Sequence, residues 1–216
     1  MKKWLVFLVL VALPASAAEK KLFNGKDLTG WARIPRHEGA PADQKPGFLV
    51  QDGLLVSVPD APEDDLWWTG GKIGNATLRV VYKYSAPTAN SGVFTRIPYQ
   101  PKSEDDAINK GIEVQIQDSG DDYHCTGVLY SMTKAKARPY KPAGEWNTLE
   151  IEMRGPRTIV KLNGVLVTDY DGVSPVPPKK GQYEPDRGPR PDEGYIAIQH
   201  HGGAETLWFK EITLIK

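Results

Sequence analysis

The sequence predicts an all-β fold of two packed antiparallel sheets, joined by long loops. Apolar and polar residues alternate in many short stretches, which is the period of a half-buried strand, and the chain beyond its first residues lacks convincing helical periodicity. Two dipeptides, Asp52-Gly53 and Asn163-Gly164, stand between such stretches and supply the positive φ that a tight hairpin turn requires. We expect about ten to twelve strands, a number that fits a two-sheet sandwich.

The predicted strands follow one another from residue 47 to the end of the chain. Two of them pair in a hairpin over 47–58, and two more in a hairpin over 157–172. The remaining strands are expected at 75–86, 90–99, 111–118, 126–132, 145–155, 194–202 and 206–216. The stretch 98–110 is polar and 174–194 is rich in Pro and Gly, so both are predicted to be loops. Loops of that length in a compact domain are usually functional or disordered.

Residues 1–17 are predicted to be a signal peptide. Lys2 and Lys3 precede an apolar run over 4–13, and Ala15-Ser16-Ala17 forms a small-residue cleavage site. The apolar run is too short to span a bilayer comfortably. We therefore expect a mature chain over 18–216 that is a single secreted or periplasmic domain, with no transmembrane segment once the signal is removed.

The composition narrows the classes of partner. Lys plus Arg and Asp plus Glu both number 27, so the net charge is zero, and no basic excess indicates nucleic acid or an anionic membrane. Cys125 is the only cysteine of the 216 residues, which rules out an intrachain disulfide. His124 is its neighbour, and adjacent residues of a strand point to opposite faces. Cys125 is thus expected to be a buried small residue rather than a nucleophile.

A polar row within GIEVQIQD (111–118) is the first candidate for a site. Ile112, Val114 and Ile116 alternate there with Glu113, Gln115 and Gln117. The apolar set is expected between the sheets, and the polar set on the outer face of its sheet. Sugars require carboxylate and amide groups, because hydroxyls both donate and accept hydrogen bonds. The row predicts either the floor of a sugar-binding groove or an ordinary solvated sheet face.

Charged residues near this row are the next candidates. Arg96 shares a face with Phe94 by the two-residue period, and it can pair with Glu113 if the two strands are neighbours. Such a pair would lower the pKa of Glu113 and make it a better base than acid. His200 and His201 follow Gln199 at a strand end, where a histidine can serve as acid or base.

The loop after the polar row and a tryptophan pair give further candidates. Asp118, with the aspartates at 121 and 122, offers oxygen ligands for calcium, but turns favour Asp in any case, so no cofactor or metal is expected. His124 and Lys134 follow, and both can reach the groove. Of Trp67 and Trp68, one is expected in the core and the other, taken as Trp68, as an aromatic platform for a sugar ring. No second acid is expected to face the acid of the polar row, which disfavours a two-carboxylate glycosidase.

Several stretches, taken in order, resemble the 3-keto-disaccharide hydrolase domain family, long known as a domain of unknown function (DUF1080). They are LFNGKDLTGW (22–31), FLVQDGLL, NSGVFTR, GIEVQIQD followed by TGVLY, GEWNTLEIEMRG, LNGVLVTDYD and the terminal GYIAIQHHG and LWFKEITL. The resemblance runs from Lys21 to Lys216, and it is carried by the ordered set rather than by one motif. It implies a concanavalin-like jelly-roll sandwich in a periplasmic or secreted protein that acts on sugars.

The resemblance also implies an activity, the cleavage of 3-keto-glycosides by a glycoside hydrolase or an elimination-type glycosidase. The expected catalytic residues are Glu113, Arg96 and His200. The expected substrate-binding residues are Gln115, Gln117, Gln199, Asp118, Trp68, Lys134 and His124. The alternative is a non-catalytic carbohydrate-binding module, because the same groove on the same fold would serve either function.

Overall fold

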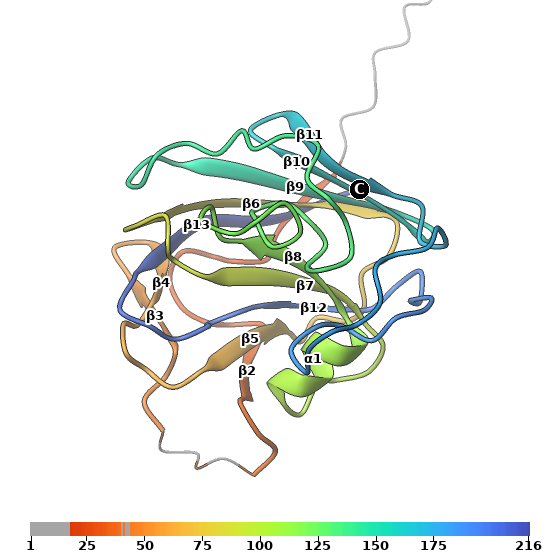
Figure 1. Ribbon diagram of the computed structural model, residues 1–216. Helices are drawn as coiled ribbons and strands as arrows, with labels where there is room; N and C mark the ends of the chain where they lie inside the picture. The colour runs from red at the N-terminus through yellow and green to blue at the C-terminus, as the bar shows by residue number, and fades with distance from the viewer. Residues whose placement is uncertain (1–17, 40, 42–43) are drawn as a thin grey trace, which may run out of the picture.

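The protein folds as a sandwich of two antiparallel sheets, which confirms the predicted all-β jelly-roll class (Figure 1). This computed structural model describes residues 18–39, 41 and 44–216, which form thirteen strands and one short helix. The predicted signal peptide, residues 1–17, lies outside the described residues. No helix within the described ranges is long and apolar enough to cross a bilayer.

The larger sheet has eight strands. Their order is β11 (Val165–Tyr170), β10 (Arg157–Leu162), β9 (Asn147–Arg154), β6 (Ala76–Tyr84), β13 (Leu207–Ile215), β4 (Leu54–Ser57) and β3 (Phe48–Gln51), with β1 (Glu19–Lys21) paired to β13. Both predicted hairpins are present: β3 and β4 turn at Asp52-Gly53, and β10 and β11 turn at Asn163-Gly164. All four turn residues have positive φ, as these hairpin turns require.

The smaller sheet has five strands and carries the candidate site. Their order is β2 (Trp31–Pro35), β5 (Asp64–Trp68), β12 (Tyr195–Ile198), β7 (Ser91–Ile97) and β8 (Ile112–Ile116). The strands β1, β2 and β5 were not predicted, because all three are short and none shows clear alternation. The strand predicted over 126–132 is wrong. That segment pairs with β8 only through scattered bonds, since Gly127 and Ser131 turn its backbone with positive φ.

The main core lies between the two sheets. It includes Ile112, Val114 and Ile116 of β8, which are at most 2 % exposed. Cys125 is also fully buried there as a free thiol, which is the packing role expected of it. Because alternate side chains of a strand point to opposite faces, the polar residues of β8 lie on the outer face of the smaller sheet.

A second apolar cluster covers that outer face and places a helix on it. The helix α1 (Glu104–Lys110) packs through Ala107 and Ile108 against Phe94 and Ala197. Residues 98–110 were predicted to be a loop, and this is wrong for the helical part. Three acids in the first turn and Lys110 in the last suit the helix dipole, but seven residues are too few to show a helical period.

A β-bulge in β7 redirects Arg96. Tyr195 of β12 pairs with Ile97, and Ala197 pairs with Phe94, so two residues of β7 oppose one residue of β12. Arg96 has a φ of 58°, and this bulge cancels the two-residue alternation on which its prediction rested. Its side chain therefore points away from the polar row.

The buried guanidinium of Arg96 holds two other segments together. It donates to Pro191 O at 2.9 Å, to Arg157 O at 3.0 Å and to Thr158 Oγ1 at 3.4 Å. These acceptors belong to the end of the long 174–194 loop and to the start of β10. The predicted ion pair of Arg96 with Glu113 is thus wrong. Arg96 instead joins the end of the 174–194 loop to β10 through its hydrogen bonds.

Candidate active site

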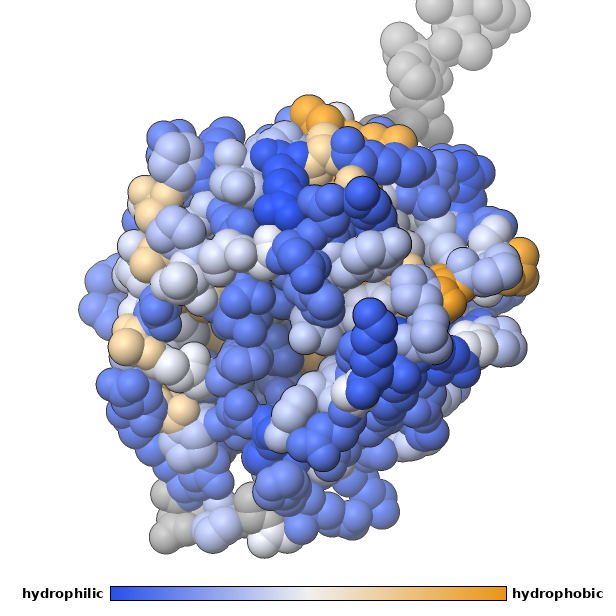
Figure 2. All heavy atoms as spheres, in the orientation of Figure 1, coloured by the Kyte–Doolittle hydropathy of each residue, from blue (hydrophilic) through white to orange (hydrophobic). Residues whose placement is uncertain are grey.

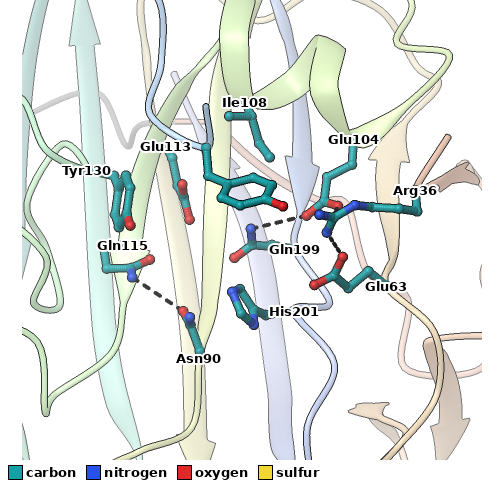
Figure 3. Close-up of a pocket in the computed structure, with 11 residues that line it drawn as sticks. Arg36, Glu63, Asn90, Glu104, Ile108, Glu113, Gln115, Tyr130, Gln199 and His201 are labelled. Atoms are coloured by element: carbon teal, nitrogen blue, oxygen red, sulfur yellow. Dashed lines mark hydrogen bonds and ion pairs between the residues drawn. The ribbon is translucent and has the colours of Figure 1, made fainter. Parts of the chain in front are cut away.

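A pocket lies on the outer face of the smaller sheet, between the sheet, α1 and the long 174–194 loop (Figure 3). Its volume is about 200 Å³, which suits one sugar ring. The space-filling view shows a mainly hydrophilic surface on the side drawn in Figure 1 (Figure 2). The pocket is lined by Arg36, Glu63, Asn90, Glu104, Ile108, Glu113, Gln115, Tyr130, Tyr183, Gln199 and His201.

Glu113 is the first residue of the polar row and is 5 % exposed. It lies on β8, opposite Phe94 of β7, and Gly92 is the next residue on the same face. A Cβ at Gly92 would overlap the Glu113 carboxyl group, so the glycine in NSGVFTR leaves room for this carboxyl. The backbone thus accommodates a buried acid at this position.

The amide of Gln115 sits between two sets of partners. In one orientation its nitrogen contacts Asn90 Oδ1 and Gln117 Oε1, each at 3.3 Å. With the amide turned over, the nitrogen donates to Glu113 Oε1 and to Ser91 O, each at 3.0 Å. Only the second orientation places the amide nitrogen, rather than the amide oxygen, against Glu113 and Ser91 O, so Gln115 can then donate to the Glu113 carboxylate when it is ionised.

Burial and a second acid raise the pKa of Glu113 to about 8. Burial is the larger cause, because it penalises the charged form. The charge of Glu104 adds to it. The sequence predicted a pKa lowered by Arg96, and this is wrong in direction, because Arg96 points elsewhere. Near neutral pH much of Glu113 therefore carries a proton.

Glu104 begins α1 and is held by an ion-pair network. Arg36 Nη1 contacts Glu104 Oε2 at 2.9 Å and also contacts Glu63. Gln199 donates from Nε2 to Glu104 Oε1 at 3.4 Å. Burial raises the pKa of Glu104, whereas Arg36 opposes this rise. The acid that sequence reasoning did not expect beside Glu113 is thus supplied by the helix.

A third carboxyl group lies beneath this pair. Asp65 of β5 is fully buried, and its Oδ1 accepts from the backbone N–H of His200 at 2.9 Å. Burial first and Glu104 second raise the pKa of Asp65 well above its usual value. Its bond to His200 fixes the chain between Gln199 and His201, the two pocket residues of that strand end.

The two histidines occupy different environments. His201 lines the pocket, whereas His200 is 3 % exposed and turns inward against Phe48. The ring Nε2 of His200 lies 3.0 Å from Val58 O, so the predicted placement of His200 in the site is wrong. His201 is exposed at the pocket surface. Partial desolvation by its neighbours and the Arg36 charge lower the pKa of His201, which favours its neutral ring at neutral pH.

Several predicted binding residues lie outside the pocket lining. Asp118 accepts from Thr126 Oγ1 at 2.5 Å and from Tyr84 in the interior. Trp68 packs edge-on against Trp31 of the core, with ring centroids 5.6 Å apart. The other member of its pair, Trp67, lies on the outer face, where it packs against Tyr195 and does not line the pocket, so the prediction of Trp68 as a platform is wrong and Trp67 does not replace it.

Of the remaining predicted residues, two line the pocket and three do not. Gln115 and Gln199 line it, whereas Gln117 does not and contacts the Gln115 amide in one of its two orientations. His124 stacks edge-on against Tyr130, which lines the pocket, with ring centroids 4.9 Å apart. Lys134 is an exposed residue paired with Asp122 at 3.4 Å and does not line the pocket.

The aspartates considered for calcium have separate partners. Asp118 is bonded to hydroxyl groups, Asp121 to His124 at 2.7 Å, and Asp122 to Arg138 at 2.9 Å. Within 18–39, 41 and 44–216 no group of three or more His, Cys, Asp or Glu residues is placed to hold a metal ion. The carboxylates of this loop do not converge on a common point.

Sequence reasoning missed several lining residues, among them Arg36, Asn90, Glu104, Tyr130 and Tyr183. The acids at the start of α1 resemble any solvated polar loop. Tyr183 lies in a Pro- and Gly-rich stretch without periodicity. The length of that stretch was the available signal, because long loops in compact domains are often functional.

The fold and the site define a jelly-roll protein of the kind that binds or cleaves carbohydrates. The pocket combines carboxyl, amide, imidazole and guanidinium groups, which can bind hydroxyls and transfer protons. Residues 18–215 match the model of the 3-keto-alpha-glucoside-1,2-lyase-like domain, and the chain belongs to this family. A search of curated proteins found no match.

Solved structures of similar fold also include carbohydrate-related proteins. A candidate glycosyl hydrolase from Parabacteroides distasonis ATCC 8503 is 26 % identical over 91 % of this chain and 98 % of its own, with a TM-score of 0.68. A second protein so described from that organism has 22 % identity, covers 91 % of this chain and 93 % of its own, and has a TM-score of 0.70. The carbohydrate-binding module CBM66 from Bacillus subtilis shares the fold at 13 % identity, covering 87 % and 96 %, with a TM-score of 0.52.

Proposed function

We propose that the protein is a secreted or periplasmic enzyme that cleaves glycosides whose sugar carries a keto group at C3. The observation that carries the proposal is the buried Glu113, whose pKa is raised to about 8 inside a pocket the size of one sugar ring. A base is most effective when its pKa lies near the working pH. Perturbed carboxyl groups in a cleft are also typical of catalytic sites.

The proposed reaction is an elimination. The C3 keto group acidifies the C2 proton, because the electron pair left on C2 spreads onto the keto oxygen. The Glu113 carboxylate takes this proton, the pair forms a C1=C2 double bond, and the glycosidic oxygen leaves C1. The protonated Glu113 then returns the proton to the departing oxygen. Water added later across the double bond would give the free 3-keto sugar, which makes the overall reaction a hydrolysis.

Other pocket residues have assigned roles in this proposal. Arg36 is the candidate donor to the keto oxygen, in place of Arg96, because its guanidinium lines the pocket. Neutral His201 is a second candidate for the base, because a neutral imidazole can accept a proton. Gln115 and Gln199 are placed to bind sugar hydroxyls.

Two other functions remain as alternatives. A carbohydrate-binding module is supported by the fold shared with CBM66, but convergent titratable groups are more typical of an enzyme than of a lectin face. A conventional glycosidase for plain sugars is supported by Glu104, the second acid beside Glu113. Such an enzyme needs two carboxyl groups flanking the scissile bond.

A substrate panel tests the proposal. The purified protein is incubated with plain and 3-keto disaccharides, with and without a chelator, and monosaccharide release is followed. We expect release from the 3-keto sugars only. Glu113→Gln should lower kcat/KM by roughly 10²- to 10⁴-fold, because it removes the proton acceptor.

The matched control is Glu145→Gln, which alters an exposed carboxyl group in the turn before β9. It should behave as wild type. Full activity of Glu113→Gln on 3-keto sugars, or equal cleavage of the plain disaccharides, would contradict the proposal. Binding without cleavage of either class would identify a carbohydrate-binding module instead.

A further inference from the structure

An exposed aromatic ring stands at the mouth of the pocket. Tyr183 lines the pocket and remains 51 % exposed. The guanidinium carbon of Arg36 lies 5.3 Å from its ring centroid, a cation–π contact that steadies the ring from one side. Tyr99 and Tyr140 are also exposed, but they do not line the pocket.

The loop that carries Tyr183 is held in place by its own polar contacts. Arg187 donates to Pro177 O and to Pro185 O, each at 2.6 Å. Asp186 pairs with Lys110 of α1 at 2.6 Å, which ties the loop to the helix beside the pocket. A ring fixed in this way loses little conformational freedom when a ligand binds, and preorganisation of this kind increases affinity.

The size of the pocket determines which part of a substrate can contact the ring of Tyr183. A volume of about 200 Å³ suits one sugar ring, so we expect the second ring of a disaccharide at the mouth. The face of an aromatic ring is electron-rich and attracts the weakly positive C–H groups on the flat side of a pyranose. Tyr183 offers such a face at the place where the leaving group would emerge.

We infer that Tyr183 forms a second subsite, which binds the leaving group of the substrate and favours a pyranose ring there. This inference rests on the proposed function and adds to it the residue that contacts the leaving group. It makes the protein selective for disaccharides over glycosides with a small alkyl group. Tyr183 is accordingly a residue that determines specificity, while Glu113 transfers the proton.

The test compares two substrates in three proteins. The substrates are 3-keto-trehalose, whose leaving group is a pyranose, and methyl 3-keto-α-glucoside, and the proteins are wild type, Tyr183→Ala and Tyr183→Phe. We expect Tyr183→Ala to lower the ratio of kcat/KM values, disaccharide over methyl glycoside, by roughly three- to tenfold, the size of a lost aromatic contact. Tyr183→Phe keeps the ring and should retain most of the ratio. An unchanged ratio in Tyr183→Ala would overturn the inference.

A binding measurement separates this inference from the proposed function. Calorimetry gives the Kd of unmodified trehalose and of methyl α-glucoside for wild type, Tyr183→Ala and the control Tyr140→Ala. A selective weakening of trehalose in Tyr183→Ala supports the subsite even if no 3-keto sugar is cleaved. Equal weakening of both ligands, or no binding of trehalose to wild type, refutes it.

Discussion

At the level of single residues, the proposed chemistry depends on the order in which two buried acids lose their protons. Glu104 is held by Arg36, which favours its ionised form, whereas Glu113 has no cation among the causes of its pKa shift. Glu104 therefore ionises first, and its charge helps to keep the proton on Glu113. The pocket thus prepares a carboxylate that is a stronger base than an exposed glutamate.

This order predicts a pH dependence. If ionised Glu113 is the base, kcat/KM rises with pH through a pKa of about 8. Glu104→Gln removes one negative charge that raises this pKa, so the rising limb should move to lower pH. The measurement is the pH profile of kcat/KM on a 3-keto-glycoside.

Glu63→Gln is the matched control for this profile. Glu63 also contacts Arg36 and lines the pocket, but its charge is not among the causes of the Glu113 shift. It should leave the midpoint where it is. A midpoint that does not move in Glu104→Gln, or one that moves to higher pH, would contradict the assigned coupling.

At the level of elements, alternation along strands predicted part of the site, and departures from regular strands explain the errors. Regular alternation in β8 correctly directed Glu113 and Gln115 outward. The bulge in β7 reversed the expected direction of the Arg96 side chain. The residues around Arg96 contain no local sequence pattern that predicts such a bulge. Glu104 was missed for a different reason, because a two-turn helix is stabilised by its packing on the sheet rather than by its own sequence.

The bulge also predicts a structural role for Arg96. Arg96→Ala leaves the carbonyl groups of Pro191 and Arg157 and the hydroxyl group of Thr158 without their donor. Of these acceptors only Thr158 belongs to a buried residue. An unpaired buried acceptor costs about 1–3 kcal/mol, so we expect a loss of roughly 1–3 kcal/mol in the free energy of unfolding, measured by urea denaturation.

Arg79→Ala provides the comparison for Arg96→Ala. Arg79 is partly exposed on the larger sheet and pairs with Glu211 and Glu19. Exposed ion pairs contribute about 0–1 kcal/mol, so this change should have a small effect. Lost activity with unchanged stability in Arg96→Ala would show instead that Arg96 acts on the substrate, as the sequence first predicted.

At the level of the whole molecule, the two sheets form a rigid support that can accommodate an unfavourable site on its surface. The core between the sheets is continuous and almost fully buried, and the predicted strands supply most of it. Asp65, Glu104 and Glu113 are buried carboxyl groups whose pKa values are all raised. Sites of this kind often reduce stability in exchange for reactivity.

The raised pKa of Glu113 predicts how the stability of the folded protein changes with pH. The pKa of Glu113 is 4.5 in an ordinary setting and about 8 in the folded protein, so the folded state binds its proton more tightly than the unfolded state. The stability that this proton contributes is fully present below pH 4.5 and is lost as the pH rises through 8. Glu113→Gln cannot ionise, so it should be increasingly more stable than wild type as the pH rises. The expected gain between pH 5 and pH 9 is on the order of a few kcal/mol.

Chemical denaturation of wild type, Glu113→Gln and Glu145→Gln at several pH values measures this difference. The exposed Glu145 carboxyl group should leave the pH dependence as it is in wild type. Parallel stability curves for wild type and Glu113→Gln would show that Glu113 ionises near its ordinary pKa, and would remove the observation on which the proposed function rests. A difference in the free energy of unfolding that widens with pH would establish the raised pKa of Glu113. This measurement needs no substrate, because the pH dependence of stability reflects the proton that Glu113 binds in the folded state.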